Sequence, residues 1–161
     1  MKGLVVYQSY YGNTKQVAEA VADECRKSGH SAEAQEVKAK LPDPKAFDFV
    51  FVGAPTRMGR GGGKVKRVLK RLVKRGCTKN PVVIFDTCAV LPADPKEREK
   101  SLPWVEPGAA GRLHALALRL GLNVYPKTLR CEVTGMKGPL GAQELEKARA
   151  FAREFLSGLK G

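Results

Sequence analysis

The sequence is poor in the residues that most often carry metal and acid–base chemistry. It has two histidines and four cysteines in 161 residues, and no two cysteines form a C-x-x-C pair. Scattered cysteines do not predict a zinc site or an iron–sulfur cluster, and reduced thiols are the simplest interpretation. His30 and His114 are isolated in the sequence, so we interpret each as a surface or structural side chain rather than a catalytic one.

Long apolar segments are also absent from the sequence. No apolar run approaches the roughly 18–20 residues that cross a membrane, and the N-terminal run Leu4–Tyr7 is too short for a signal peptide. We therefore expect a cytoplasmic protein without membrane association. A length of 161 residues predicts a single domain over residues 1–161, large enough for a hydrophobic core without disulfides.

Three catalytic signatures are missing as well. The chain has no G-x-x-x-x-G-K-[ST] motif, which excludes a nucleotide-hydrolysing P-loop. None of its cysteines is followed six residues later by the arginine of a phosphatase loop. Gln8 and Ser9 stand where a response regulator needs paired acids after its first strand. No residue is therefore predicted to act as a general acid or base.

Acidic residues are missing from one window of a basic chain whose formal net charge is +13. Residues 57–81 contain ten basic and no acidic side chains, whereas residues 1–56 contain seven of each. Inside the window, Lys64–Arg75 has apolar residues at helical spacing on one face and lysine or arginine on the other. Like charges four residues apart cost a few tenths of a kcal/mol each. The uniform sign therefore predicts a docking surface for an acidic partner, and the alternative is a solvated helix face.

Short apolar runs alternate with amphipathic segments along the chain. Strands are expected at residues 4–7, 31–37, 49–52, 82–85 and 124–133, the last interrupted near Pro126. Helices are expected from near Thr14 to Gly29 and at residues 64–75, 109–120 and 145–156. This alternation predicts an α/β fold in one doubly wound domain, a parallel sheet with helices on both faces.

The segment from Cys88 to Gly108 shows no periodicity and contains four prolines. It is expected to be a long loop, inside which Lys96–Lys100 can form a helical turn. A loop of this length in a compact domain is usually functional or disordered.

A hydroxyl-rich turn is expected between the first strand and the first helix. Its residues are Ser9, Tyr10, Tyr11, Gly12, Asn13 and Thr14, with one glycine and no acid. Such a turn directs backbone N–H groups, the positive end of the helix and hydroxyl groups at one point, which suits a dianionic phosphate. The alternative is an ordinary connection in which Asn13 or Thr14 caps the helix.

The turn Ser9–Thr14, followed by Val17-Ala18, resembles the phosphate loop of flavodoxins, which binds the ribityl phosphate of FMN. Tyr11 stands where the family usually has a small hydroxyl residue. The resemblance implies the flavodoxin-like strand order 2-1-3-4-5, in which FMN binds where the winding of the sheet reverses.

The resemblance extends to two further loops. In flavodoxins the loop after the third strand flanks the isoalloxazine, and a peptide next to a glycine in it bonds flavin N5; Met58-Gly59 stands at about that place. The resemblance therefore implies cofactor-binding residues in this loop, which are Pro55, Thr56, Arg57, Met58 and Gly59. The next loop supplies backbone donors to the ring, which corresponds to Thr87, Cys88 and Ala89. Flavodoxins commonly stack the ring between aromatic side chains, and Trp104 is the aromatic residue that these two loops offer.

Together, the residues and the resemblance imply an FMN-binding electron carrier whose flavin does the redox chemistry. The expected partner is an acidic redox protein docking near Lys64–Arg75. One alternative is an FMN-dependent NAD(P)H reductase in which the basic segment receives the phosphates of the nicotinamide cofactor. A second is a flavodoxin-like fold without flavin that binds nucleic acid through its basic helix.

Overall fold

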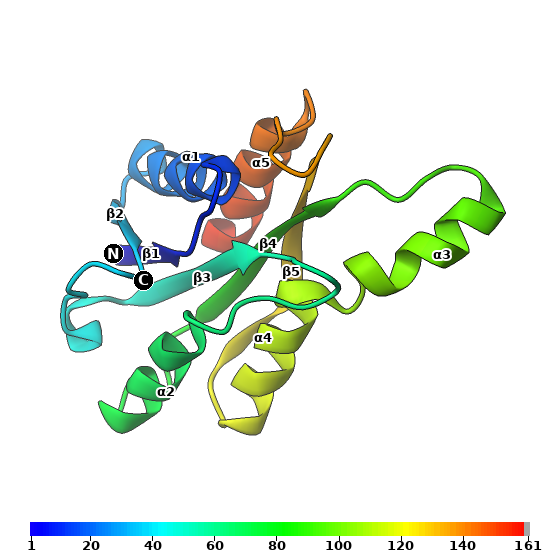
Figure 1. The fold of residues 1–161 in the computed structure, drawn as a ribbon. Coiled ribbons are helices and arrows are strands. Elements are labelled where there is room, and N and C mark those ends of the chain that lie inside the picture. The colour runs from blue at the N-terminus through cyan, green and yellow to red at the C-terminus, as the bar shows by residue number, and fades with distance from the viewer. Residues whose placement is uncertain (160–161) are drawn as a thin grey trace.

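The computed structural model describes residues 1–159, which form a parallel sheet with helices on both faces (Figure 1). Its strands are β1 (Lys2–Tyr7), β2 (Ser31–Glu36), β3 (Phe49–Pro55), β4 (Val82–Ala89) and β5 (Val124–Val133). They pair in the order β2-β1-β3-β4-β5, which confirms the predicted topology. The expected domain also includes residues 160–161, which lie outside the described residues.

Residues 1–159 form five α-helices and one 3-10 helix. They are α1 (Asn13–Lys27), η1 (Pro44–Ala46), α2 (Lys66–Lys74), α3 (Pro95–Val105), α4 (Gly108–Arg119) and α5 (Glu144–Ser157). α1 and α5 cover one face of the sheet, and α2 and α4 cover the other (Figure 1). None of the helices in residues 1–159 combines the length and the apolar character that a membrane span requires.

Two hydrophobic clusters separate the sheet from its two helical layers. Because side chains alternate along a strand, Val5 and Tyr7 of β1 pack under α1 and α5, and Leu4 and Val6 pack under α2 and α4. Both faces of the central strands are therefore buried, which explains their continuous apolar sequences.

A helix occupies part of the expected loop between Cys88 and Gly108 and extends beyond the helical turn at Lys96–Lys100, so the prediction of a long loop there was wrong. α3 begins at Pro95, where the side chain of Asp94 accepts a hydrogen bond from Glu97 N at 3.1 Å. The helix projects away from the sheet (Figure 1), and Val105 is its one buried residue. A helix with so little buried surface shows no apolar periodicity in the sequence.

The last strand runs continuously through Pro126, but its pairing with β4 is interrupted there, where the sequence predicted an interruption. Val82 pairs with Val124, whereas Ile84 pairs with Thr128, so the register shifts between these two pairs. Proline lacks an N–H group and is tolerated in a strand where regular pairing is disturbed. Pro126 lies within that irregularity.

Candidate functional site

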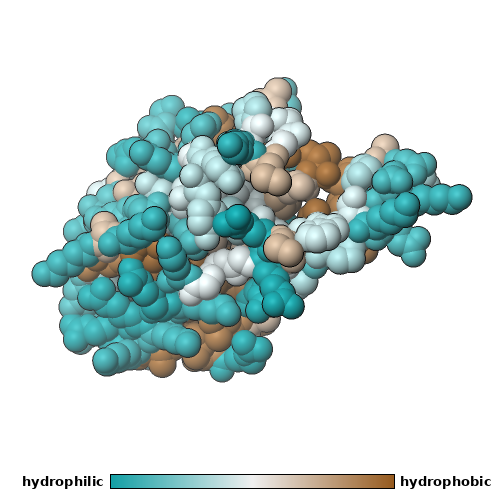
Figure 2. All heavy atoms as spheres, in the orientation of Figure 1, coloured by the Kyte–Doolittle hydropathy of each residue, from teal (hydrophilic) through white to brown (hydrophobic). Residues whose placement is uncertain are grey.

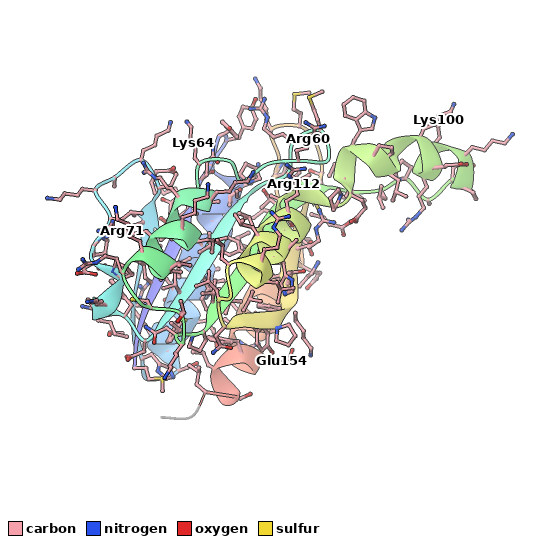
Figure 3. The ribbon with its side chains drawn as sticks, turned by 90° about the horizontal axis from the view of Figure 1, so that it is seen from below. Arg60, Lys64, Arg71, Lys100, Arg112 and Glu154 are labelled. Carbon is pink, nitrogen blue, oxygen red and sulfur yellow. The ribbon has the colours of Figure 1, made fainter. Side chains whose placement is uncertain are left out.

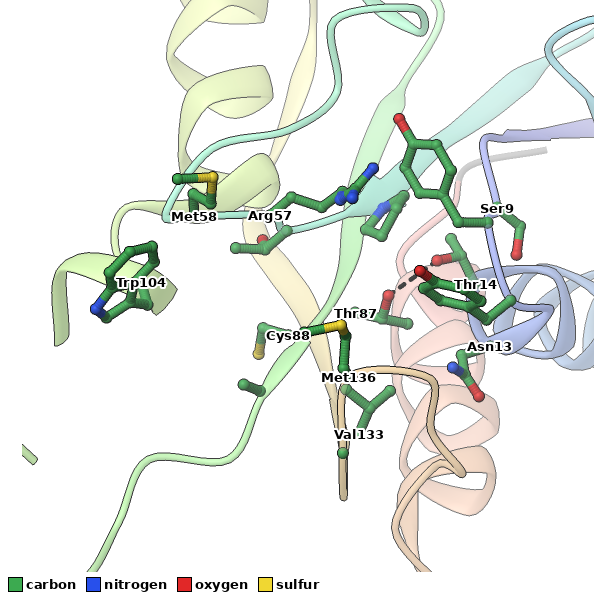
Figure 4. A pocket seen from close by; sticks show the side chains of 16 residues that line it. Ser9, Asn13, Thr14, Arg57, Met58, Thr87, Cys88, Trp104, Val133 and Met136 are labelled. Carbon is green, nitrogen blue, oxygen red and sulfur yellow. Dashed lines mark hydrogen bonds between the residues drawn. The ribbon is translucent and has the colours of Figure 1, made fainter. Parts of the chain in front are cut away.

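A cavity of about 510 Å³ opens at the carboxyl end of the sheet. It lies among the β1–α1, β3–α2 and β4–α3 connections (Figure 4), as expected where the winding of the sheet reverses. In the space-filling view, apolar side chains line the hollow between the body of the molecule and α3 (Figure 2). The cavity is lined by Ser9, Tyr10, Tyr11, Asn13, Thr14, Pro55, Thr56, Arg57, Met58, Thr87, Cys88, Ala89, Trp104, Val133, Gly135 and Met136.

Twelve of the fourteen binding residues expected from the sequence lie along this cavity. The other two, Gly12 and Gly59, shape its walls through their backbone and have φ angles of 90° and 73°. A left-handed φ is strained for residues with a Cβ atom, so both positions favour glycine. The structure thus brings the three loops together, and their role in binding remains a prediction.

The turn after β1 presents the amino end of α1 to the cavity. Gly12 is the N-cap residue of α1, and the first turn of the helix contains no acidic side chain. Ser9 Oγ accepts hydrogen bonds from Gly12 N at 3.0 Å and from Lys15 N at 3.4 Å. The hydroxyl of Ser9 therefore fixes the turn, and the positive end of the helix faces the cavity without a carboxylate nearby in sequence.

The side chains of Asn13 and Thr14 do not cap α1, unlike in the alternative interpretation of this turn. Asn13 Nδ2 donates to the carbonyl of Lys137 at 3.1 Å. Thr14 Oγ1 lies 2.9 Å from Thr87 Oγ1, the contact drawn as a dashed line in Figure 4. These contacts join the turn to the β5–α5 connection and to the end of β4.

Two cations flank this end of the cavity. The Arg57 guanidinium lies 4.4 Å from the centre of the Tyr10 ring, and the Lys137 ammonium lies 5.8 Å from the centre of the Tyr11 ring. Both distances are within the range of cation–π attraction. The two tyrosines thus hold positive charge beside a hydroxyl-rich turn, which makes this end of the cavity favourable for an anion.

The opposite end of the cavity is formed by Met58 and Trp104, whose side chains are 70% and 56% exposed. Both lie at the same end in Figure 4. Gly59 connects their segments, because its N–H donates to the carbonyl of Trp104 at 2.8 Å and its own carbonyl accepts from Gly108 N at 2.9 Å. A Cβ atom on Gly59 would lie 2.1 Å from the carbonyl oxygen of Pro103. Glycine at this position allows the loop after β3 to contact the end of α3.

Residues from the β5–α5 connection complete the cavity, and the sequence analysis did not anticipate them. They are Gly135 and Met136, with Met136 86% exposed, and they follow Val133, the last residue of β5, which also lines the cavity. The fifth parallel strand ends at the same edge of the sheet as β1, β3 and β4. The position of β5 in the parallel sheet could therefore have predicted that the β5–α5 connection borders the cavity.

A buried ion pair lies behind the Met58–Trp104 end, and it was not predicted either. Asp86 is fully buried, and Arg130 Nε lies 3.0 Å from Asp86 Oδ1. Burial lowers the pKa of Arg130, but the hydrogen bonds and the negative charge of Asp86 outweigh this and raise the pKa above its usual value. Arg130 is therefore charged at neutral pH.

Cys88 lines the cavity as a neutral thiol. It is buried, and this burial, with the nearby charge of Asp86, raises its pKa to about 12. A thiol with this pKa is not a nucleophile at neutral pH. No group of three or more histidine, cysteine or acidic side chains suited to a metal ion occurs within residues 1–159. The chemistry of the cavity is that of a binding site for a partly apolar molecule with an anionic end.

Comparisons with known proteins agree with this geometry. A family model described as a flavodoxin domain matches residues 4–120. A flavodoxin from the domain Archaea superposes with a TM-score of 0.75 at 18% identity, covering 98% of this chain and 97% of that one. Flavodoxin 1 from Bacillus cereus superposes with a TM-score of 0.72 at 18% identity, covering 99% of this chain and 100% of that one.

A curated relative shares a shorter segment. The NAD(P)H dehydrogenase (quinone) of Gluconacetobacter diazotrophicus is 34% identical over 80 residues, which cover 37% of this chain and 40% of that protein. The match thus spans less than half of the relative's length. The family-model match covers most of the present chain and confirms the resemblance seen in the sequence. The chain belongs to the flavodoxin family.

Proposed function

We propose that this chain binds FMN in the cavity at the carboxyl end of its sheet and transfers electrons to and from a partner protein. The observation that carries the proposal is the polarity of the cavity. One end has the amino end of α1 and the hydroxyl of Ser9, and the other has Met58 and Trp104. A volume of about 510 Å³ is ordinary for a site that holds a cofactor. The bound flavin would supply the redox chemistry.

The residues at the α1 end suit the ribityl phosphate. Backbone N–H groups at a helix start and nearby hydroxyls bind phosphate without a lysine in the loop. Arg57 and Lys137, held against the rings of Tyr10 and Tyr11, add long-range attraction for a dianion. This set replaces the small hydroxyl residue that flavodoxins usually have at the position of Tyr11.

The residues at the other end suit the isoalloxazine ring. Met58 and Trp104 offer apolar and aromatic surface, and Thr87, Cys88 and Ala89, the last three residues of β4, line the cavity beside them. The neutral thiol of Cys88 adds no charge beside the ring. These residues would bind and orient the ring and exclude water from part of its surface.

A titration tests the assignment directly. The apoprotein is titrated with FMN and with riboflavin, and Trp104 fluorescence reports binding because Trp104 is the one tryptophan of the chain. We expect a 1:1 complex with FMN, weaker binding of riboflavin, and absorption bands near roughly 375 and 450 nm, which are properties of the flavin itself. Absence of flavin binding would overturn the proposal.

The proposed partner is an acidic redox protein that docks on the lysines of α2. Three arginines of this segment contact the neighbouring loop instead of solvent alone: Arg67 donates to the carbonyl of Val37, Arg71 to that of Leu41, and Arg75 pairs with Asp43. By contrast, the lysines form no ion pair with any residue in the range 1–159. We call them the α2 lysine row, which consists of Lys64, Lys66, Lys70 and Lys74.

The α2 lysine row lies next to the proposed flavin loop. Figure 3 views the molecule from the side of α2 and α4, with Lys64 near the start of α2 and Arg60 farther along the β3–α2 connection. Within the row, Lys64 lines a hollow together with Tyr10, Pro55 and Arg57. A partner attracted to the row would therefore dock beside the loop after β3, next to the α1 end of the cavity. Complementary charge acts mainly on the rate of association.

A second candidate function is reduction of the flavin by NAD(P)H. Two observations favour it: the curated relative is an NAD(P)H dehydrogenase (quinone), and a second hollow of about 260 Å³ shares Tyr10, Pro55 and Arg57 with the main cavity. Lys64 and the backbone of Gly61–Gly63 also line this hollow. Steady-state oxidation of NAD(P)H with a quinone acceptor distinguishes the two functions, because an electron carrier alone does not catalyse it.

A further inference from the structure

The ring end of the cavity is built from segments that have little apolar packing of their own. Met58 is exposed, and α3, which carries Trp104, buries only Val105. Elements with so few buried apolar contacts open easily. Some other interaction must fix the positions of these two side chains.

The carboxylate of Asp86 is connected to the loop after β3. Thr56 Oγ1 donates to Asp86 Oδ2 at 2.7 Å and accepts a hydrogen bond from Ala109 N at 2.8 Å. Asp86 Oδ2 also accepts from Ala110 N at 3.0 Å. One fully buried carboxylate thus anchors both the residue two positions before Met58 and the start of α4.

The guanidinium of Arg130 is connected to the end of α3. Arg130 Nη2 donates to Asp86 Oδ2 at 3.0 Å and to the carbonyl of Val105 at 2.9 Å, and Nη1 donates to Glu106 Oε1 at 2.7 Å. Arg130 is 23% exposed at its side chain. Hydrogen bonds between such partly buried charged groups are stronger than neutral ones.

Backbone contacts also connect the loop after β3, which carries Met58, to the end of α3, which carries Trp104. Gly59 exchanges hydrogen bonds with the residues at positions 104 and 108, as described above. A Cβ atom on Gly108 would lie 2.3 Å from Arg130 Nη2 and 2.7 Å from Thr56 Oγ1. The loop after β3, the end of α3 and the ion pair are therefore in direct contact.

We propose that Asp86 and Arg130 are positioning residues that hold Met58 and Trp104 in place across the ring end of the cavity. Neither lines the cavity, so they act through Thr56 and through the segment from Val105 to Ala110. Preorganised walls lower the entropic cost of binding a rigid planar group. The part of this inference that concerns ligand affinity rests on the proposed flavin function, whereas the part that concerns Trp104 does not.

A conservative substitution tests the inference without a ligand. Arg130→Lys keeps the positive charge but loses the fork that joins Asp86 to Val105. In the apoprotein we expect it to weaken the near-ultraviolet circular dichroism of Trp104 and to raise the acrylamide quenching of its fluorescence. The matched control is Arg149→Lys, since Arg149 is 28% exposed and pairs with Asp23 at 2.7 Å on the opposite face of the sheet. The control should leave both Trp104 signals unchanged.

Ligand titration gives a second readout. Arg130→Lys should weaken FMN and riboflavin together by about tenfold, the loss expected for one charged hydrogen bond, because both ligands carry the ring. A change at the phosphate end affects FMN alone. Loss of affinity for FMN only, or equal losses in Arg130→Lys and Arg149→Lys, would overturn the inference.

A second pair of variants applies if Arg130→Lys folds poorly by far-ultraviolet circular dichroism. Thr56→Val removes the hydroxyl that bridges Asp86 and Ala109, and Thr56→Ser restores it. We expect Thr56→Val to increase the mobility and the solvent exposure of Trp104, and Thr56→Ser to keep the Trp104 signals of the original chain. Unchanged Trp104 signals in folded Thr56→Val would overturn the positioning role. If Trp104 responds as expected but the original chain binds no flavin, the positioning role stands and the proposed function fails.

Discussion

On one face of the sheet, α1 and α5 together carry six acidic and six basic side chains, and on the other, α2 and α4 carry seven basic and no acidic ones. The α1–α5 layer uses its charges internally. Arg149 contacts Asp23, and Arg153 contacts both Glu24 and Glu146, so ion pairs cross between and along the helices. No comparable pair joins α2 to α4 within the described range of the chain.

Both layers nevertheless cover the sheet with a continuous hydrophobic cluster. Since α2 and α4 cover their face of the sheet without an ion pair between them in the described residues, burial of apolar side chains is sufficient to position a layer, and charge pairing between its helices is not required. The unbalanced charge of the α2–α4 layer therefore has another cause. Part of it is local, because the α2 arginines contact the loop at 37–43. The lysines of the α2 lysine row form no ion pair within residues 1–159, so their charge is available to a partner.

The largest effect is expected from variants that remove the difference in charge between the two helical layers. Exchange of Lys66, Lys70 and Lys74 for glutamate reverses the charge of the α2 lysine row. With an acidic redox partner, the association rate at low salt should fall by about 10- to 1,000-fold, the range that electrostatic steering covers. The original chain should slow steeply as salt rises, because screening acts over about 8–10 Å, and the variant should not.

The control for this experiment carries the same change of net charge elsewhere. Lys38, Lys40 and Lys79 are exposed and lie outside the α2 lysine row. Their exchange for glutamate should leave most of the salt dependence intact. If the association rates of the original chain and of the row variant depend equally on salt, the α2 lysine row does not take part in docking. A salt-sensitive complex with DNA or RNA would favour the nucleic-acid alternative.

The next largest effect is expected from substitutions in the turn before α1, which is the part of the cavity that adjoins the α1–α5 layer. The affinity for FMN should change. Thr14→Ala should weaken FMN by about 10- to 100-fold, corresponding to a charged hydrogen bond of about 1.5–3 kcal/mol. Riboflavin lacks the phosphate and should lose much less. Gly12→Val should act in the same direction, since valine is strained at a φ of 90°. Parallel titrations of both ligands check this, and equal losses would show that the turn does not hold the phosphate.

The segments on which these experiments act differ in how well the sequence predicted them. β1, the turn and α1 are adjacent in the chain and have strong local patterns, so they were predicted correctly. α3 was missed because Val105 is its one buried residue, and a helix shows apolar periodicity in its sequence only where one of its faces is buried. Asp86 and Arg130 are directly paired in the register of β4 and β5. That register depends on the irregularity near Pro126. The proline predicts a break in the pairing but not the size of the shift, so the pairing of Asp86 with Arg130 could not be predicted from the sequence.

A smaller effect should appear as the pH is lowered. Arg149 and Lys27 lower the pKa of Asp23 through hydrogen bonds, and Arg153 lowers the pKa of Glu146. A carboxylate whose pKa is lower in the folded state stabilises that state above its unfolded pKa, about 4, and loses this contribution as the pH falls through the folded pKa. We expect amide protection in α1 and α5 to decline below about pH 4.

Hydrogen exchange measured by mass spectrometry checks this pH dependence helix by helix. The double variant Asp23→Asn, Glu146→Gln removes the two titrating groups, so its protection in α1 and α5 should vary less with pH. α2 and α4 contain no carboxylate of their own and serve as internal references. A decline of equal size in α2 and α4, unaffected by the double variant, would contradict the assignment of the acid sensitivity to the α1–α5 layer.

The smallest expected effect compares one lysine from each layer. Lys70 has Lys66 and Lys74 four residues away on either side, so Lys70→Gln should raise the free energy of unfolding by a few tenths of a kcal/mol. Lys27 lies 3.2 Å from Asp23 on α1, so Lys27→Gln should lower it. Urea denaturation of both variants at low and high salt measures the two changes, and both should shrink as salt is added. Destabilisation by Lys70→Gln would mean that the α2 lysine row is held by favourable contacts and not by a role in docking.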